Sequence, residues 1–227
     1  MSDGTRGVAV FTMNVDGVQA RKGYFFDHDA IYELGNGITS ESPFPVATTV
    51  NSCRRNGEIK QGENWVWHDG IGYRGERMKL ETGVRKGDWR YLEGGLTEPA
   101  PAEADLFTLT VDHGTKPVND SYVFSIQPGT TPEATAKGPG GKVLAATEKL
   151  QAVEFADGAI GAIFYEPGTL GDFSTSAPGV FLITKEHVFA ADPTAKLKEL
   201  TVRRNGVERT LALPGGEEAG STVAVTF

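Results

Sequence analysis

Cysteine is nearly missing from this sequence, since Cys53 is the single one among 227 residues. A lone thiol excludes a disulfide within the chain, and we expect it to be a small buried side chain. No run of about 18 apolar residues occurs, so no transmembrane helix is expected. The start, Met1–Gly4, has no apolar signal-peptide core, which predicts either a cytoplasmic protein or one whose export signal has been removed.

Positive charge is also scarce. Lys and Arg number 22 against 30 Asp and Glu, which gives a net charge of -8 and a pI near 5.1. An acidic surface repels nucleic acid and anionic membranes, so neither is an expected partner. The same charge opposes tight binding of a polyanionic sugar by this chain alone.

The motifs of several common active sites are absent. We find no Gly-rich phosphate loop between a strand and a helix, no G-x-S-x-G, no H-E-x-x-H and no Cys/His cluster with zinc spacing. Four scattered histidines remain, and a structural or surface role is predicted for each: His28, His68, His113 and His187.

Turn formers and short alternating runs are plentiful. Glycine occurs 29 times and proline 12 times, and Asp16-Gly17 is a strong hairpin signal. No helical pattern longer than two turns is visible. The sequence therefore predicts an all-β fold, in which a large antiparallel β-sandwich over residues 1–132 precedes a smaller C-terminal β-sandwich over residues 143–227. The linker, residues 133–142, includes part of a segment that could form one helical turn.

Three local predictions follow from the turn signals. A strand from Ala30 to Leu34 should end at Gly35-Asn36-Gly37. Residues 77–91 should hold two short strands about Lys86-Gly87. The proline-rich segment Glu98–Glu103 should be a loop.

The stretch Glu63–Tyr73 concentrates aromatic and polar side chains. In a strand, Trp65 and Trp67 share one face and Val66 and His68 share the other, and Asp69-Gly70 then forms a turn. One interpretation packs both indoles into the core, and this is the expected arrangement. The alternative is a sugar-binding platform made of Trp65, Trp67 and His68, which would require both indoles to be open to solvent.

Asp27 and Asp29 form the densest acidic cluster, with Glu33 nearby. Alternation in a strand places both carboxylates on one face, where they could bind calcium, which takes several oxygen ligands. A solvated turn without an ion is the alternative.

Residues 65–73, WVWHDGIGY, also resemble the W-V-x-H-D-G-I-G-Y segment in the β-sandwich region of polysaccharide lyase family 8. That family includes the hyaluronate, chondroitin and xanthan lyases. Further stretches resemble it in the family's order: 22–40, 47–57, 106–129 and 150–170. Together they cover most of the chain, and five segments in register are specific.

The resemblance implies a part of a carbon–oxygen lyase that cleaves acidic, uronate-containing polysaccharide by β-elimination, secreted or periplasmic. In the family, the asparagine, histidine, tyrosine and arginine of the catalytic site lie in an N-terminal helical toroid. Nothing in this chain resembles that domain, so no family catalytic residue can be assigned here. The family's D-D-E pattern near Asp27 implies a structural cation, and His28-Asp29-Ala30 departs from that pattern. No other cofactor is expected.

Three functional hypotheses remain open. The first is a supporting or sugar-contacting sandwich portion of a family 8-like lyase, which needs the missing helical domain as its partner. The second is a stand-alone carbohydrate-binding or structural module. The third is a small independent lyase that uses His68 and Tyr73. We expect the isolated chain to lack lyase activity and to bind such polysaccharides no tighter than about millimolar.

Overall fold

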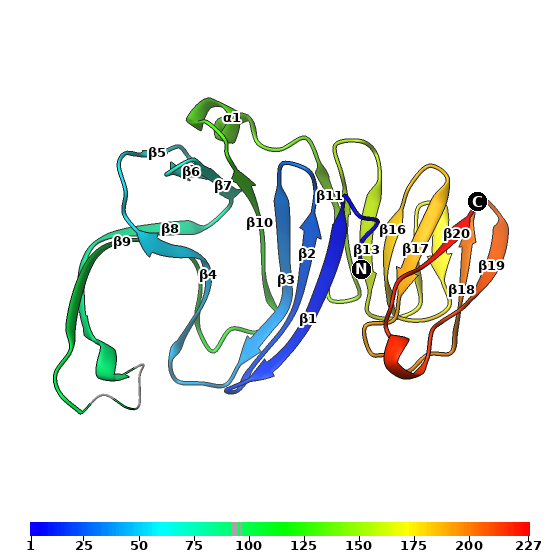
Figure 1. Ribbon diagram of the computed structural model, residues 1–227, viewed down its shortest axis with the longest axis horizontal. Helices are drawn as coiled ribbons and strands as arrows, with labels where there is room; N and C mark the ends of the chain where they lie inside the picture. Colours follow the sequence, from blue (N-terminus) through cyan, green and yellow to red (C-terminus); the bar gives the residue numbers. More distant parts are fainter. Residues whose placement is uncertain (92–94, 96) are drawn as a thin grey trace.

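The computed structural model describes residues 1–91, 95 and 97–227, and their strands form four antiparallel sheets that stack in a row (Figure 1). We name them, in the order of stacking, the arm sheet, the central sheet, the inner sheet and the outer sheet. The all-β prediction is confirmed, because α1 (Pro132–Lys137) is a helix of only six residues. It is the helical turn predicted from the sequence, with the side chain of Thr131 capping its first turn. Among the described residues there are also two single 3₁₀ turns, η1 (Trp89–Tyr91) and η2 (Gly216–Glu218).

The first two sheets are built from residues 7–128. The arm sheet has the order β4 (Pro45–Arg54), β9 (Pro101–Thr115), β8 (Met78–Asp88). The central sheet has the order β1 (Gly7–Val15), β2 (Val18–Phe26), β3 (Ile31–Ser40), β10 (Asp120–Pro128), β7 (Ile71–Gly75), β6 (Trp65–His68), β5 (Ile59–Gln61).

The last two sheets are built from residues 142–226. The inner sheet has the order β11 (Lys142–Ala146), β12 (Leu150–Glu154), β13 (Ile160–Phe164), β16 (Gly179–Ile183), β17 (His187–Ala191), β20 (Val223–Thr226). The outer sheet has the order β14 (Gly168–Leu170), β15 (Phe173–Thr175), β18 (Glu199–Arg204), β19 (Val207–Ala212).

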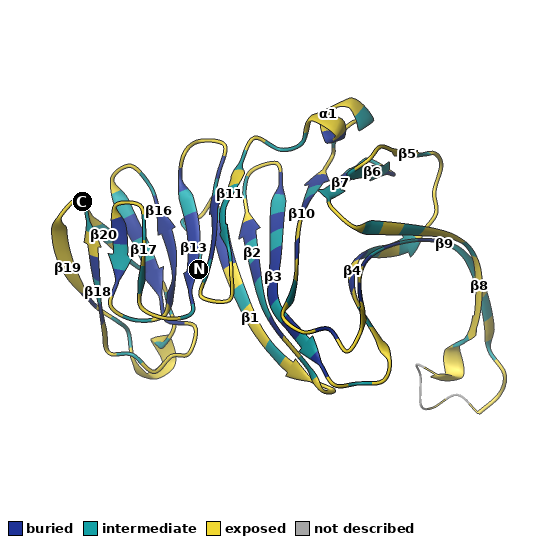
Figure 2. Ribbon diagram, turned by 180° about the vertical axis from the view of Figure 1, so that it is seen from behind, coloured by how far each residue is buried: buried dark blue, intermediate teal, exposed yellow. Residues whose placement is uncertain are grey.

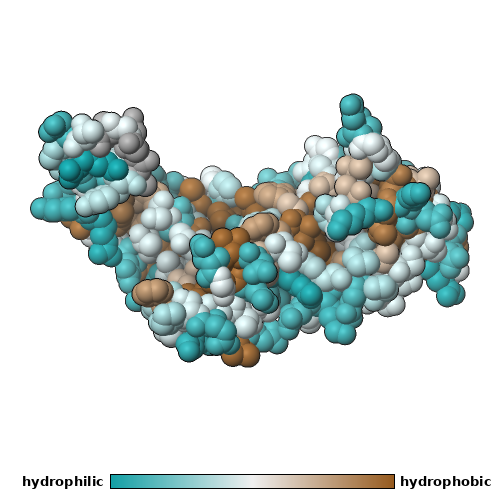
Figure 3. Space-filling model, turned by 90° about the horizontal axis from the view of Figure 1, so that it is seen from below, coloured by the Kyte–Doolittle hydropathy of each residue, from teal (hydrophilic) through white to brown (hydrophobic). Residues whose placement is uncertain are grey.

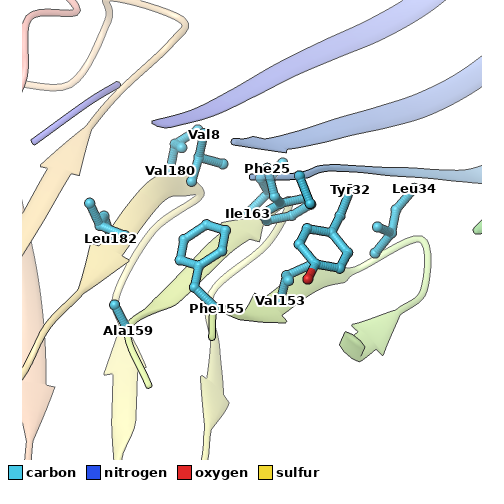
Figure 4. Packing of buried hydrophobic residues seen from close by; sticks show 11 residues of the cluster. Val8, Phe25, Tyr32, Leu34, Val153, Phe155, Ala159, Ile163, Val180 and Leu182 are labelled. Atoms are coloured by element: carbon cyan, nitrogen blue, oxygen red, sulfur yellow. The ribbon is translucent and has the colours of Figure 1, made fainter. Parts of the chain in front are cut away.

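One hydrophobic cluster fills each space between neighbouring sheets, and the dark blue residues of Figure 2 mark these layers. Val8, Phe25 and Leu34 of the central sheet meet Phe155 and Leu182 across the space between the central and inner sheets (Figure 4). Full burial of each such side chain stabilises the fold by roughly 1.5–3 kcal/mol. The other two clusters lie between the inner and outer sheets and between the arm and central sheets, the latter around Tyr73, Phe107 and Phe124.

Glycine allows the central and inner sheets to approach closely. A Cβ atom on Gly161 would lie 2.8 Å from the ring of Phe25, and one on Gly23 would lie 2.4 Å from the side chain of Gln151. Any larger residue at either position would push the two sheets apart. Close contact of these layers thus depends on residues without side chains.

Two of the three local predictions made from turn signals are wrong and the third is wrong in part, because strand pairing overrides the local signal. β3 runs through Gly35-Asn36-Gly37 to Ser40, since β2 and β10 pair with it on both sides. β8 is one strand through Lys86 and Gly87, which pair with β9. Of the predicted loop Glu98–Glu103, residues 98–100 lie outside any strand, but β9 begins at Pro101, a position at a strand end that tolerates proline.

β8 and β9 form a long hairpin that extends from the rest of the molecule (Figure 1). No residue of β8 is fully buried. In the part of the chain that the structure describes, we find no helix with the length and apolarity needed to span a bilayer.

Candidate functional site

The β6–β7 hairpin carries the residues that the sequence singled out. Asp69 and Gly70 form its turn with φ of 50° and 78°, the left-handed pair of a type I′ hairpin, so the turn prediction is confirmed. β6 lies between β5 and β7 near one edge of the central sheet, and α1 packs against β6 and β7.

The two tryptophans share a face of β6, as predicted, but that face is not the core. Val66 and His68 are 5% and 1% exposed and point toward the arm sheet, whereas both indoles are half-buried on the other side. Trp67 donates from Nε1 to the carbonyl of Thr130, 2.8 Å away, on the segment that leads into α1. The indoles are therefore partly covered by a short helix, and the core takes the smaller side chains because the arm sheet packs on their face.

His68 is held in the core by contacts on every side. Its ring stacks on Phe107 with centroids 4.5 Å apart and an interplanar angle of 7°. Nε2 accepts a hydrogen bond from the backbone N–H of Asn56 at 3.1 Å, so the ring proton is on Nδ1, which lies 3.8 Å from Sγ of Cys53. The ring thus has no free nitrogen for a sugar.

Tyr73 lies in the same cluster, next to an asparagine that sequence reasoning did not place there. The amide of Asn51, on β4 of the arm sheet, donates to the Tyr73 hydroxyl, and the Tyr73 ring also stacks on Phe107. Burial raises the pKa of Tyr73 above its usual value, because the phenolate would be poorly solvated. We call Asn51, Cys53, His68 and Tyr73 the His68–Tyr73 cluster.

This cluster contains an asparagine, a histidine and a tyrosine, three of the residue types that β-elimination uses. It is nevertheless closed, since Tyr73 and His68 are each 1% exposed between two sheets. A general base must reach within about 2.6–3.2 Å of the proton that it removes. A polysaccharide cannot approach these atoms without separating the arm sheet from the central sheet.

A second polar network crosses the same interface and has no signal in the sequence. Thr48 Oγ1 lies 2.9 Å from Nε2 of His113, and Nδ1 of His113 lies 2.6 Å from Oδ2 of Asp120. Arg77 forms an ion pair with the Asp120 carboxylate. The order hydroxyl, imidazole, carboxylate is that of a hydrolytic triad. Here Thr48 is only 9% exposed and His113 8%, so the network ties the arm sheet to β10.

The carboxyl of Asp120 responds to this environment. Its partial burial acts to raise the pKa, but hydrogen bonds from Arg77 and His113 outweigh that effect and hold the pKa below its usual value. Asp120 therefore stays ionised and keeps His113 oriented toward Thr48.

Asp27 and Asp29 differ in their surroundings. Asp27 accepts hydrogen bonds from the backbone of His28 at 2.9 Å and of Ala156 at 3.2 Å, one on each oxygen, whereas Asp29 is exposed. Across residues 1–91, 95 and 97–227 we find no group of three or more His, Cys, Asp or Glu side chains placed to hold a metal ion. Asp27 thus joins the end of β2 to the segment after β12, and a calcium ion at this pair stays a prediction.

A groove lies on the surface, at the junction of the central sheet with the segment after α1. Its volume is about 520 Å³, and we call it the junction groove. The charged residues along it are Arg74, Glu76, Arg77, Asp120 and Lys137.

Apolar side chains are also exposed on the central sheet. Phe11 of β1 and Phe26 of β2 are 48% and 39% exposed. Both alternate with residues that pack on the inner sheet, so they lie on the side of the arm sheet, beyond its edge. Seen from below, the molecule is hollowed along one side, with apolar surface in the middle of the hollow and hydrophilic ends (Figure 3).

Comparison with known proteins identifies the family that shares this architecture. Residues 1–138 match the polysaccharide lyase family 8 super-sandwich domain, and residues 142–201 match the C-terminal β-sandwich domain of the same family. Chondroitinase-AC of Pedobacter heparinus is 33% identical over 260 residues, which cover 98% of this chain and 37% of that enzyme.

Solved structures agree. A chondroitinase AC lyase, studied in complexes with oligosaccharides, superposes with a TM-score of 0.89 at 31% identity, over 99% of this chain and 39% of that one. The Streptomyces coelicolor A3 chondroitin AC lyase, in complex with chondroitin sulphate, gives 0.81 at 26% identity, over 88% and 29%. The chain thus spans less than half the length of these relatives. With both of its domains matched in order, the chain belongs to polysaccharide lyase family 8.

Proposed function

We propose that this chain is the β-sandwich portion of a secreted polysaccharide lyase, supporting a catalytic domain and contacting acidic polysaccharide without performing the elimination itself. The observation that carries the proposal is the closed His68–Tyr73 cluster. Two units, residues 1–132 and 143–227, would be joined by residues 133–142.

The chemistry of uronate elimination explains why a closed cluster argues against catalysis. The sugar carboxylate must be neutralised before the neighbouring proton can be removed, and a base, an acid and a clamp must meet in one cleft. His68 and Tyr73 have the right chemistry but no access, and Asn51 is already committed to Tyr73.

The exposed apolar side chains of the central sheet support the proposed role as a support for a catalytic domain. Phe11 and Phe26 expose large apolar surface on a sheet that is covered elsewhere. Exposed apolar surface of this kind marks regions that pack against other protein parts. A neighbouring domain of a longer lyase is the partner that fits, because the relatives are more than twice as long as the matched region.

Two experiments test the proposal. The purified chain, incubated with hyaluronan, chondroitin and xanthan, should release no unsaturated uronate, measured by ultraviolet absorbance. Steady release that His68→Ala or Tyr73→Phe abolishes would contradict the proposal and identify an independent lyase.

The supporting role is tested with a chimera. The matched 37% of the Pedobacter heparinus enzyme is replaced by this chain. The chimera should retain lyase activity, whereas the same enzyme truncated before that region should not. A chimera that melts cooperatively but is inactive would contradict the supporting role and favour a stand-alone carbohydrate-binding module.

A further inference from the structure

We propose that the junction groove binds an acidic sugar unit, with Arg74 and Lys137 holding its carboxylate or sulfate group. This inference rests on the proposed function and adds a binding site to it. The groove lies at the surface between β7, β10 and residues 137–143. Its volume of about 520 Å³ is within the range of 300–1,000 Å³ that is typical of small-ligand sites.

Arg74 is held in position before any ligand arrives. Its Nη1 donates to the carbonyl of Ala136 at 2.8 Å, at the end of α1. Its side chain also lies against Gly138, where a Cβ atom would come within 2.8 Å of Cδ of Arg74. Because a guanidinium has five N–H donors and Ala136 takes one of them, the others remain for an anion.

Lys137 supplies a second positive charge. It is exposed, and among the described residues it forms no ion pair. Arg77, in contrast, is paired with Asp120. The groove has three cations and two carboxylates, so its net charge is +1 in a chain of net charge -8. An anion is therefore attracted here although the molecule as a whole repels it.

One neutral group at the surface of the groove suits sugar hydroxyls. Asn64 lines the groove and is partly exposed, and its side-chain amide can both donate and accept hydrogen bonds. Tyr32 and Ser125 also line the groove, but at 4% and 5% exposed they form its floor. Two cations beside an amide match a charged sugar better than an inorganic anion, which has no hydroxyl pattern to satisfy.

Titration of the isolated 227-residue protein, followed by nuclear magnetic resonance, tests the site. The probes are a hyaluronan tetrasaccharide, which has carboxylates only, a chondroitin sulfate tetrasaccharide, which also has sulfates, and an uncharged N-acetylglucosamine tetrasaccharide. We expect groove amides to shift with the two charged probes at a Kd of about 1 mM, and not with the uncharged one. Affinity should fall as salt is added, because the contact is ionic and solvent-exposed.

Charge variants test whether binding is electrostatic, because removal of a positive and of a negative charge should change the affinity in opposite directions. Lys137→Gln should weaken binding about two- to five-fold, and Glu76→Gln should strengthen it by a similar factor, as expected for one exposed charge each. Lys198→Gln, an exposed lysine on the outer sheet side, is the matched control and should change nothing. Arg74→Lys keeps the charge but removes the planar set of guanidinium N–H donors, and should also weaken binding.

Several results would overturn the assignment: equal binding of the uncharged probe, equal effects of Lys198→Gln and Lys137→Gln, or no shift of groove amides up to about 10 mM. Melting curves of each variant show whether it folds. If no oligosaccharide binds while the chimera is active, the groove assignment fails and the supporting role stands. If the charged oligosaccharides bind and a folded chimera is inactive, the groove assignment stands and the supporting role fails.

Discussion

Replacement of Asp120 by asparagine should reveal how the arm sheet is tied to the central sheet. The carboxylate accepts hydrogen bonds from His113 at 2.6 Å and from the backbone N–H of Ser121 at 2.7 Å, and it is paired with Arg77. Asparagine keeps the shape but removes the charge. Hydrogen bonds to charged groups contribute about 1.5–3 kcal/mol to stability. Loss of the Asp120 charge also weakens the hydrogen bond that orients the buried His113 ring. We therefore expect the Asp120→Asn variant to lose about 2 kcal/mol of unfolding free energy at pH 7.

The stability difference between wild type and Asp120→Asn should itself depend on pH. The pKa of Asp120 is lowered in the folded protein, so its contribution is fully present above its unfolded pKa, about 3.9, and is lost as pH falls through the folded pKa. Other carboxyls with lowered pKa values, such as Asp27 and Asp192, destabilise both proteins equally in acid. The difference between wild type and variant should thus shrink below about pH 4.

Urea denaturation at pH 7 and at about pH 3 measures this double difference. At pH 7 the midpoint should fall by roughly 1 M, since about 2 kcal/mol is divided by a slope of about 2 kcal/mol per molar. Asp29→Asn, at an exposed carboxylate, is the control and should leave the midpoint unchanged. A variant as stable as wild type at pH 7, or a difference that is constant with pH, would refute the account of the network.

Other predictions follow from the same interior. Phe107→Ala removes the ring on which His68 and Tyr73 stack, and calorimetry should show a loss of about 3–5 kcal/mol, whereas Phe44→Ala at an exposed ring should cost little. Burial raises the pKa of Glu33 to about 7, so the folded protein loses stability as pH rises from about 4.3 to 7, and Glu33→Gln should be more stable than wild type at pH 8 but not at pH 4. Burial also raises the pKa of the Cys53 thiol, so iodoacetamide should modify native protein at pH 7.5 far more slowly than unfolded protein, and equal rates would show that the thiol is accessible.

Local signals were reliable where neighbours in sequence decide the conformation. The left-handed turn at Asp69-Gly70, the helical turn after Thr131 and the alternation of β6 all depend on residues within a few positions of one another. The same signals failed at Gly35-Asn36-Gly37 and at Lys86-Gly87, because a glycine that can begin a turn also fits a strand once a neighbouring strand pairs with it. β2 and β10 flank the first segment, and β9 pairs with the second.

Which face of β6 enters the core could not be derived from β6 itself. Alternation shows that Trp65 and Trp67 share a face, but only the position of the arm sheet decides that Val66 and His68 are the buried pair. The expectation from the sequence was that the tryptophan face enters the core. It was wrong because α1 covers only part of that face and the large arm sheet covers the other.

The sequence by itself thus determined the fold class, the family and the scarcity of catalytic motifs, since all of these are properties of residue patterns along the chain. The tertiary structure alone decided what the polar residues do. Thr48 and His113 lie 65 residues apart in the chain and meet only because β4 pairs with β9. The tertiary structure also brings His68 and Tyr73 together with Asn51 and buries both rings between the arm and central sheets. The junction groove likewise exists because a segment after α1 returns beside β7 and β10, a contact that no local pattern encodes.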